Sequence, residues 1–218
     1  MIYSIYVTVG ATIPFDGIVD TIFNEAEDNF FKQLKKLNTT EKSTVNLVVQ
    51  CGDTYERLYK QHIEPRCPNK VTNKFVNNLI TILDTNEYKN ATLKLSEQLE
   101  LNVIFFKLST NINKLLSELS PDFVITHAGT GSLLDALNIE KVKIITVVNT
   151  SLMNNHQLEI AEKFEQYGVV TCCRDLAEFE KMVKNDEDSI FDKSKDNGRG
   201  KNMIRGYKKE FEYDILLF

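Results

Sequence analysis

The sequence contains no tryptophan, few cysteines and no excess of basic residues. Its four cysteines, Cys51, Cys67, Cys172 and Cys173, include no C-x-x-C pair, so neither a zinc site nor a disulfide framework is predicted. We expect reduced thiols in a cytoplasmic protein. Because 26 Lys and Arg residues face 31 Asp and Glu residues, the net charge is −5. That charge excludes a general attraction to nucleic acid and a polybasic membrane anchor.

Long hydrophobic runs are also missing, although 42% of the residues are apolar. No segment approaches the ~20 apolar residues of a membrane-spanning helix. The first residues, MIYSIYVTVGA, are apolar but have no basic segment before them. They therefore predict a buried strand and not a signal peptide.

Apolar runs typical of buried strands alternate with helical periodicity along the chain. The run VKIITVV (142–148) is almost continuously apolar, as expected for a strand covered on both faces. Such alternation predicts an α/β fold, a Rossmann-like parallel sheet with right-handed crossovers. The predicted strands are 2–9, 47–52, 102–108, 122–126, 142–148 and 169–173. The predicted helices cover about 14–37, 111–119, the residues after the turn 127–132 to about 138, 155–167 and the residues from 175.

We assign residues 1–185 to this domain and expect an irregular excursion at 62–100, which holds two prolines and many Asn and Lys residues. Residues 186–200 are charged and contain glycine, which is typical of a linker. In 201–218 apolar residues recur at three- and four-residue spacing. This pattern predicts a C-terminal helix with an apolar stripe that must be buried, either on this domain or on a partner.

Three loops follow predicted strands and should lie at one edge of the sheet: Gly10–Phe15, His127–Ser132 and Asn149–Gln157. In open α/β sheets, ligands bind beyond the carboxyl ends of the strands. The loops therefore predict a ligand site. Their candidate binding residues are Gly10, Ala11, Thr12, His127, Gly129, Thr130, Gly131, Ser132, Asp135, Asn154, Asn155, His156 and Gln157.

The turn HAGTGS (127–132) is the most informative of the three. Gly129 and Gly131 let a ligand approach the backbone, and Thr130 and Ser132 add hydroxyl donors. The helix that follows presents free N–H groups and a partial positive charge, which suit a diphosphate. The alternative is a plain strand-to-helix turn, because short glycine motifs occur often without a ligand.

Polar side chains near this turn have both functional and structural interpretations. Asp135, one helical turn beyond Gly131, could accept both hydroxyls of a ribose, or could be a solvated surface charge. A lone histidine such as His127 is more often a packed residue than a catalyst, so spacing alone does not make it a base. The run Asn154–Gln157 suits sugar hydroxyls, although one of its Asn residues could only cap a helix.

Three ordered segments resemble a known family. VTVGATIPF (7–15), THAGTGSLLDAL (126–137) and NTSLMNNHQLEIAEKF (149–164) are similar to the cytosolic subunit of the UDP-N-acetylglucosamine transferase of asparagine-linked glycosylation, a relative of glycosyltransferase family 28. The resemblance covers the first 60 residues and 101–173 well, and is weak elsewhere. It implies the C-terminal, donor-binding half of a GT-B glycosyltransferase.

The resemblance also implies roles for particular residues. The turn Gly129–Ser132 would receive the UDP diphosphate, and Asp135 would bind ribose where a bacterial relative has Glu. The loop Asn154–Gln157 would lie near the sugar, and the loop at Gly10 would face the cleft between two halves. The second half is implied to be a separate, membrane-anchored subunit that presents a lipid-linked acceptor.

The implied reaction is an inverting transfer of N-acetylglucosamine that forms a β1,4 link on N-acetylglucosaminyl-diphosphodolichol. It would take place at the cytosolic face of the endoplasmic reticulum and need no cofactor. His127 is one candidate for the general base, although the partner could also supply it. We expect the partner to bind this chain through residues 201–218 and the cleft face. No D-x-D-like metal motif follows a strand. Two alternatives stay open: a non-catalytic UDP-sugar-binding or docking module, and another GT-B-type enzyme such as a sugar-nucleotide epimerase.

Overall fold

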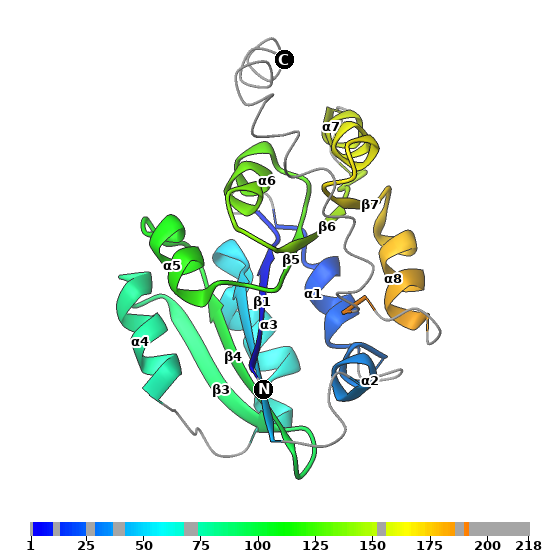
Figure 1. The fold of residues 1–218 in the computed structure, drawn as a ribbon. Coiled ribbons are helices and arrows are strands. Elements are labelled where there is room, and N and C mark those ends of the chain that lie inside the picture. Colours follow the sequence, from blue (N-terminus) through cyan, green and yellow to red (C-terminus); the bar gives the residue numbers. More distant parts are fainter. Residues whose placement is uncertain are drawn as a thin grey trace.

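Strands and helices alternate along most of the chain in the computed structural model, which describes residues 2–10, 14–24, 29–36, 42–67, 74–151, 156–185 and 190–191 (Figure 1). The order of elements agrees with the predicted α/β alternation. The elements are β1 (Ile2–Thr8), α1 (Gly17–Ile22), α2 (Asn29–Lys36), β2 (Ser43–Gln50), η1 (Gly52–Thr54), α3 (Tyr55–His62), η2 (Glu64–Arg66), α4 (Lys74–Leu83), β3 (Tyr88–Lys94), β4 (Leu99–Phe106), α5 (Ile112–Leu119), β5 (Phe123–Thr126), α6 (Thr130–Leu137), β6 (Lys143–Val147), α7 (His156–Gln166), β7 (Thr171–Cys173) and α8 (Leu176–Lys184).

The strands form one seven-stranded sheet in the order β3-β4-β2-β1-β5-β6-β7. All neighbouring strands are parallel except β3 and β4, which pair antiparallel. Chain order runs outward from β1 through β2 on one side and from β5 through β7 on the other. The direction of winding therefore reverses between β1 and β5, and the connecting helices cover both faces of the sheet.

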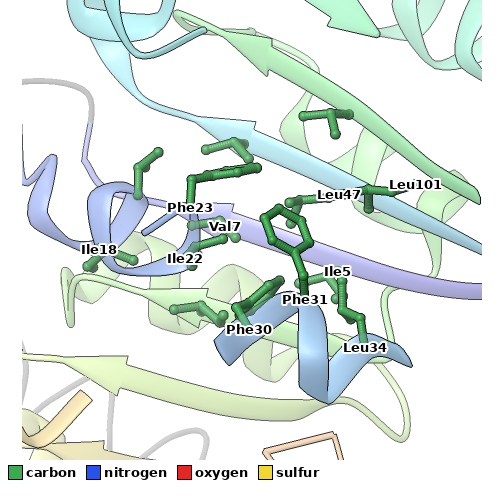
Figure 2. Packing of buried hydrophobic residues seen from close by; sticks show 14 of the residues in the cluster. Ile5, Val7, Ile18, Ile22, Phe23, Phe30, Phe31, Leu34, Leu47 and Leu101 are labelled. Carbon is green, nitrogen blue, oxygen red and sulfur yellow. The ribbon is translucent and has the colours of Figure 1, made fainter. Parts of the chain in front are cut away.

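Each face of the sheet carries its own hydrophobic core. Figure 2 shows the first, in which Ile5 and Val7 of β1 pack with side chains of α1 and α2. Tyr6 points to the opposite face and packs in a second cluster with residues of α4, α5 and α6. Alternation of side chains along a strand explains why a nearly continuous apolar strand supplies both cores.

The helix predicted over about 14–37 is present as two helices, α1 and α2. Apolar residues recur every four positions in this range, which predicts one buried helix face. Four of them, Ile18, Ile22, Phe30 and Leu34, are buried in the first core, and Ala26 lies outside the described residues. The spacing therefore identified the buried side correctly. The backbone has left the helical region at Phe23, which ends α1.

The segment 62–100, which we predicted to be irregular, is largely regular where it is described. It contains α4, which buries Val76, Leu79 and Leu83, and the whole of β3. Strand β3 pairs with β4 over its full length, from Tyr88 opposite Phe106 to Lys94 opposite Glu100. The pairing explains the error: an edge strand buries only part of its side chains, so its sequence carries a weak apolar signal.

The predicted linker 186–200 has two described residues, Ile190 and Phe191, and both are buried. The ring of Phe191 makes edge-on contacts with Phe30 of α2 and Phe123 of β5, each with 5.1 Å between centroids. The chain is thus fixed to the domain after α8. The predicted C-terminal helix 201–218 lies outside the described residues. Across the described ranges, no helix combines the length and apolar character needed to cross a membrane.

Candidate functional site

The reversal of winding between β1 and β5 places two of the three predicted loops side by side. The chain leaves β1 towards α1 on one face and leaves β5 towards α6 on the other, so a topological switch point lies between Gly10 and His127. Ligands of open α/β sheets bind at such a point, and we call this position the crevice. The backbone N–H of His127 donates to the Thr8 carbonyl at 3.2 Å, which joins the two strand ends. Strand β6 pairs with β5, so the loop that begins at Val148 lies at the same edge. The predicted convergence of these loops is confirmed for their described parts.

Gly10 has a left-handed φ of 88°, which a residue with a side chain rarely adopts. It directs the chain away from β1 at the crevice. Ala11 and Thr12, which we also predicted as binding residues, lie outside the described residues.

The two glycines of the turn HAGTGS have different structural roles. The left-handed residue of the turn is neither glycine but Ala128, with φ 62°, which is fully buried. A Cβ on Gly129 would collide with the imidazole of His127, so this glycine accommodates a side chain of the protein itself. A Cβ on Gly131 would meet nothing within 4 Å. Open space for a ligand therefore lies at Gly131.

Helix α6 begins with unsatisfied backbone donors. Its N-cap residue is Gly129, which has no side chain to cap the helix, and no acidic residue stands in the first turn. The N–H groups of Thr130, Gly131 and Ser132 precede the first internal bond, from Leu133 N to Gly129 O at 3.0 Å. Such a helix start favours an anionic ligand.

His127 is half-buried behind this turn, and its Nδ1 lies 3.4 Å from the Thr8 carbonyl oxygen. Burial lowers the pKa of the imidazole, and the Thr8 contact only partly offsets this effect. The ring is therefore neutral at pH 7 and adds no positive charge to the helix start.

Asp135 stands one turn into α6, half-buried, and its carboxylate makes no hydrogen bond or ion pair with any described residue. Burial raises the pKa of this carboxyl above its usual value. An unpaired, partly desolvated carboxylate gains free energy from hydroxyl donors on a ligand. Asp135 is also close enough to Tyr6 of β1 to raise the pKa of that phenol, after the larger effect of burial.

Beneath the turn lies a group of residues that the sequence reasoning missed. The last residues of β1, β2 and β5 and a residue of β6 are in register and share the face covered by α6. All are buried and polar, and we call them the polar row: Gln50, Thr8, Thr126 and Thr146. The sequence did contain a signal for this group, because each of these polar residues stands at or near the end of a strongly apolar strand.

Two members of the polar row have hydrogen-bonding capacity to spare. The Oε1 atom of Gln50 accepts from Tyr6 Oη at 2.8 Å and from Thr8 Oγ1 at 3.2 Å, whereas its Nε2 has no partner within the described ranges. The Oγ1 atom of Thr126 is buried and likewise has no partner there. Buried polar groups are normally paired, so the unpaired hydroxyl of Thr126 at this loop edge indicates a ligand.

The third loop is described in part. Asn149 is buried, and its Oδ1 accepts from Ser151 N at 3.1 Å and Ser151 Oγ at 2.6 Å, which fixes the start of the loop. The predicted residues Asn154 and Asn155 lie outside the described residues, and His156 is the first residue of α7. The Oε1 atom of Gln157 is buried without a partner in the part of the chain that is described, so it remains a candidate ligand contact.

The described residues contain no group of three or more His, Cys, Asp or Glu side chains that could hold a metal ion. All four cysteines are free. Burial raises the pKa of Cys173 to about 12 and also raises that of Cys172, so both thiols are protonated at pH 7. The groups described at this edge of the sheet that could contact a ligand are therefore backbone N–H donors, amides, hydroxyls and one carboxylate.

Comparison with known proteins agrees with this geometry. Residues 46–215 match the glycosyltransferase family 28 C-terminal domain. The chain is 34% identical over 170 residues to the UDP-N-acetylglucosamine transferase subunit ALG13 of Saccharomyces cerevisiae, covering 78% of this chain and 77% of that one. The protein of the same name from Kluyveromyces lactis is 34% identical over 176 residues, or 75% of each chain.

Among solved structures, MurG of Acinetobacter baumannii has a TM-score of 0.54 at 14% identity. The match covers 89% of this chain and 42% of MurG. This chain therefore resembles one part of a larger protein in its fold. The fold is that of the C-terminal half of a GT-B glycosyltransferase, as predicted. The chain belongs to glycosyltransferase family 28, through its C-terminal domain.

Proposed function

We propose that this chain transfers N-acetylglucosamine from UDP-N-acetylglucosamine to N-acetylglucosaminyl-diphosphodolichol, forming a β1,4 link with inversion. The observation that carries the proposal is its identity of 34% with two proteins named as UDP-N-acetylglucosamine transferase subunits. The open start of α6 at the switch point of the sheet supports it, because a sugar nucleotide needs a diphosphate site there.

The donor is proposed to lie across the crevice. Its diphosphate binds the free N–H groups at Gly129–Ser132, and Asp135 accepts the ribose hydroxyls. The sugar extends from the diphosphate towards the third loop, where Asn154–Gln157 supply neutral hydrogen-bonding groups. Gly10, which follows β1, borders the opposite side of the crevice, where the acceptor is proposed to approach.

In the proposed reaction the 4-hydroxyl oxygen of the acceptor attacks the anomeric carbon of the donor. The new C–O bond forms as the bond to the β-phosphate breaks, and UDP leaves with the bonding electrons. The start of α6 stabilises the developing phosphate charge, and the proton of the attacking hydroxyl passes to a base. The reaction needs no cofactor beyond the donor. His127 is neutral, as a base must be, but it lies behind the turn, so we assign the base to no residue.

The acceptor is proposed to come from a membrane-anchored partner subunit at the cytosolic face of the endoplasmic reticulum. Both named relatives are called subunits, and this chain spans 42% of MurG. A lipid-linked acceptor stays in the bilayer, so a second subunit that holds it there would complete the active site. We propose that the segment 201–218 and the crevice face contact this partner.

The test is a transfer assay with the purified full chain, radiolabelled UDP-N-acetylglucosamine and a short-chain dolichol-type acceptor. We expect a lipid-linked disaccharide only when a membrane fraction containing the partner is added. Donor binding without transfer under every condition would favour a non-catalytic binding module. Conversion of the donor to an epimer without an acceptor would favour a sugar-nucleotide epimerase.

A further inference from the structure

The carboxylate of Asp16 joins the loop that follows β1 to the residues that follow β2. Asp16 is the N-cap residue of α1, yet its side chain makes no capping hydrogen bond to that helix. Its Oδ1 atom instead accepts from Thr54 Oγ1 at 2.7 Å, and its Oδ2 atom accepts from Arg57 Nη2. An Asp at an N-cap normally accepts from the N–H groups of its own helix. Here the carboxylate connects α1 to η1 and α3.

The loop between β1 and α1 is therefore attached to the neighbouring segment at both of its ends. Before the loop, Val9 N donates to Gln50 O at 3.1 Å, which continues the pairing of β1 with β2. After the loop, Asp16 bonds to Thr54, four residues beyond the end of β2. This loop borders the crevice on the side of β1. The two attachments thus fix the points at which the chain enters and leaves the crevice.

Helix α1 is held independently of Asp16, because it lies between α3 and α8 (Figure 1). One turn after Asp16, the Oδ1 atom of Asp20 is 2.8 Å from Nε2 of His62 in α3. Against α8, the packing is so close that a Cβ on Gly17 would come within 2.5 Å of Leu176 Cδ2. Loss of the Asp16 contacts should therefore move the loop before the helix more than the helix itself.

The Asp16 contacts contribute little to the stability of the whole domain. The side chain of Arg57 is 54% exposed and that of Asp16 is 21% exposed, and water screens an ion pair in such surroundings. The fold should therefore survive their loss. A loop beside a ligand site must nevertheless be placed accurately, because a small displacement there weakens binding and catalysis strongly.

We propose that Asp16 is a positioning residue of the donor site, which holds the end of the loop Gly10–Phe15 against η1 and α3. Gly10 lies across the crevice from the open start of α6, so the loop that begins there can contact a donor bound at α6. This step rests on the proposed function. Asp16 acts through the loop and does not touch the donor, and Thr54 and Arg57 are its anchors.

The test measures the dissociation constant of UDP-N-acetylglucosamine by calorimetry on the full chain. In Asp16→Asn the amide oxygen can still accept from Thr54, but the amide nitrogen then faces the guanidinium of Arg57, donor against donor. We expect the dissociation constant to rise by about tenfold or more. The number of sites per chain, which reports the folded fraction, should stay the same.

The matched control is Asp20→Asn, the same change of carboxylate to amide one helical turn further along α1. Asp20 also contacts α3, through His62, but it lies beyond the loop. This variant should bind the donor as well as the unaltered protein does. If both variants weakened donor binding by equal factors, the effect would come from the packing of α1 as a whole, and the proposal would be overturned.

A double-mutant cycle separates positioning from direct contact. Arg57→Met should weaken donor binding about as much as Asp16→Asn does, and the double variant should be no weaker, because both changes break the same link. If Arg57 itself bound the diphosphate, Asp16→Asn would release it and tighten donor binding. Tighter binding, or losses that add, would overturn the proposal. Because Arg57 is 54% exposed, Arg57→Met also serves if Asp16→Asn does not fold.

Donor binding by the unaltered chain tests the proposed function itself. If the unaltered chain did not bind UDP-N-acetylglucosamine, the donor site and the role of Asp16 would both be wrong. Binding by the unaltered chain that stays the same in Asp16→Asn would overturn only the role of Asp16.

Discussion

At the scale of single residues, the absence of a side chain at Gly131 matters for a ligand and not for the fold. A Cβ there meets nothing within 4 Å, and the position is exposed. We predict that Gly131→Val will fold and will weaken UDP binding by about tenfold or more, because the side chain occupies the approach to the helix start. Calorimetry with UDP measures this loss.

The control for this change is Ser117→Val, which places the same β-branched residue at an exposed position of α5, away from the crevice. Ser and Val have similar helix propensities, so this variant should leave both stability and UDP binding nearly unchanged. Undiminished UDP binding by a folded Gly131→Val protein would show that the diphosphate does not bind at this turn.

Asp135 carries the second prediction at this scale. If its carboxylate accepts the ribose hydroxyls, Asp135→Asn should weaken UDP by about 5- to 150-fold, the equivalent of ~1–3 kcal/mol. The same variant should bind 2′,3′-dideoxy-UDP almost as well as the unaltered protein does. Equal losses for both ligands would leave Asp135 as a surface charge without a role in ribose binding.

The same substitution has an opposite effect on stability. Because burial raises the pKa of Asp135 from its usual 3.8, the folded state favours the protonated carboxyl. Stability therefore decreases as the pH rises from about 4 through the raised pKa, and Asn removes this loss. Urea unfolding should show Asp135→Asn gaining stability relative to the unaltered protein between pH 3 and pH 7. A gain in stability that does not depend on pH would contradict the raised pKa of Asp135.

At the scale of elements, Gln33 joins α2 to the end of α8 and to the segment beyond it. This side chain is 1% exposed, with Nε2 donating to Val183 O at 2.5 Å and Oε1 accepting from Ile190 N at 2.9 Å. Replacing Gln33 with Leu fills the space but leaves both backbone groups without this partner. We predict a loss of about 1–3 kcal/mol in the free energy of unfolding, measured in urea.

The comparison for Gln33→Leu is Gln98→Leu, in the exposed turn between β3 and β4. Surface changes of this kind are usually within about 0.5 kcal/mol. If the two variants were equally stable, Gln33 would not hold the segment that contains Phe191, and the packing of that ring alone would have to do so.

At the scale of the whole molecule, the domain has the fold of half a GT-B enzyme, and its C-terminal segment is proposed to find the other half. Met203, Ile204, Tyr207, Phe211 and Ile215 form its apolar stripe. We predict that deleting 205–218 abolishes co-purification with the proposed membrane-anchored partner, and hence transfer, while UDP binding is retained. A folded, truncated chain that still captured its partner would place the interface elsewhere, with the loop at Gly10 as the next candidate.

The sequence by itself determined the alternation of elements, the parallel sheet and the three loops at its edge. These features depend on local patterns: a short apolar run rich in β-branched residues, such as 142–148, favours a strand covered on both faces. The family also followed from short ordered motifs. Strand β3 was missed because its pairing with β4, and not its own composition, makes it a strand.

Only the tertiary structure decided which polar side chains share an environment. Gln50 and Thr126 are 76 positions apart in the sequence, and no periodicity connects them. They became neighbours of the same crevice because the strand order places β2, β1 and β5 side by side in register. The structure likewise shows that Gly129 must lack a side chain because the ring of His127 occupies that space. A glycine motif in the sequence does not reveal this steric requirement. Local physics fixes the elements, whereas the site depends on contacts between residues distant along the chain.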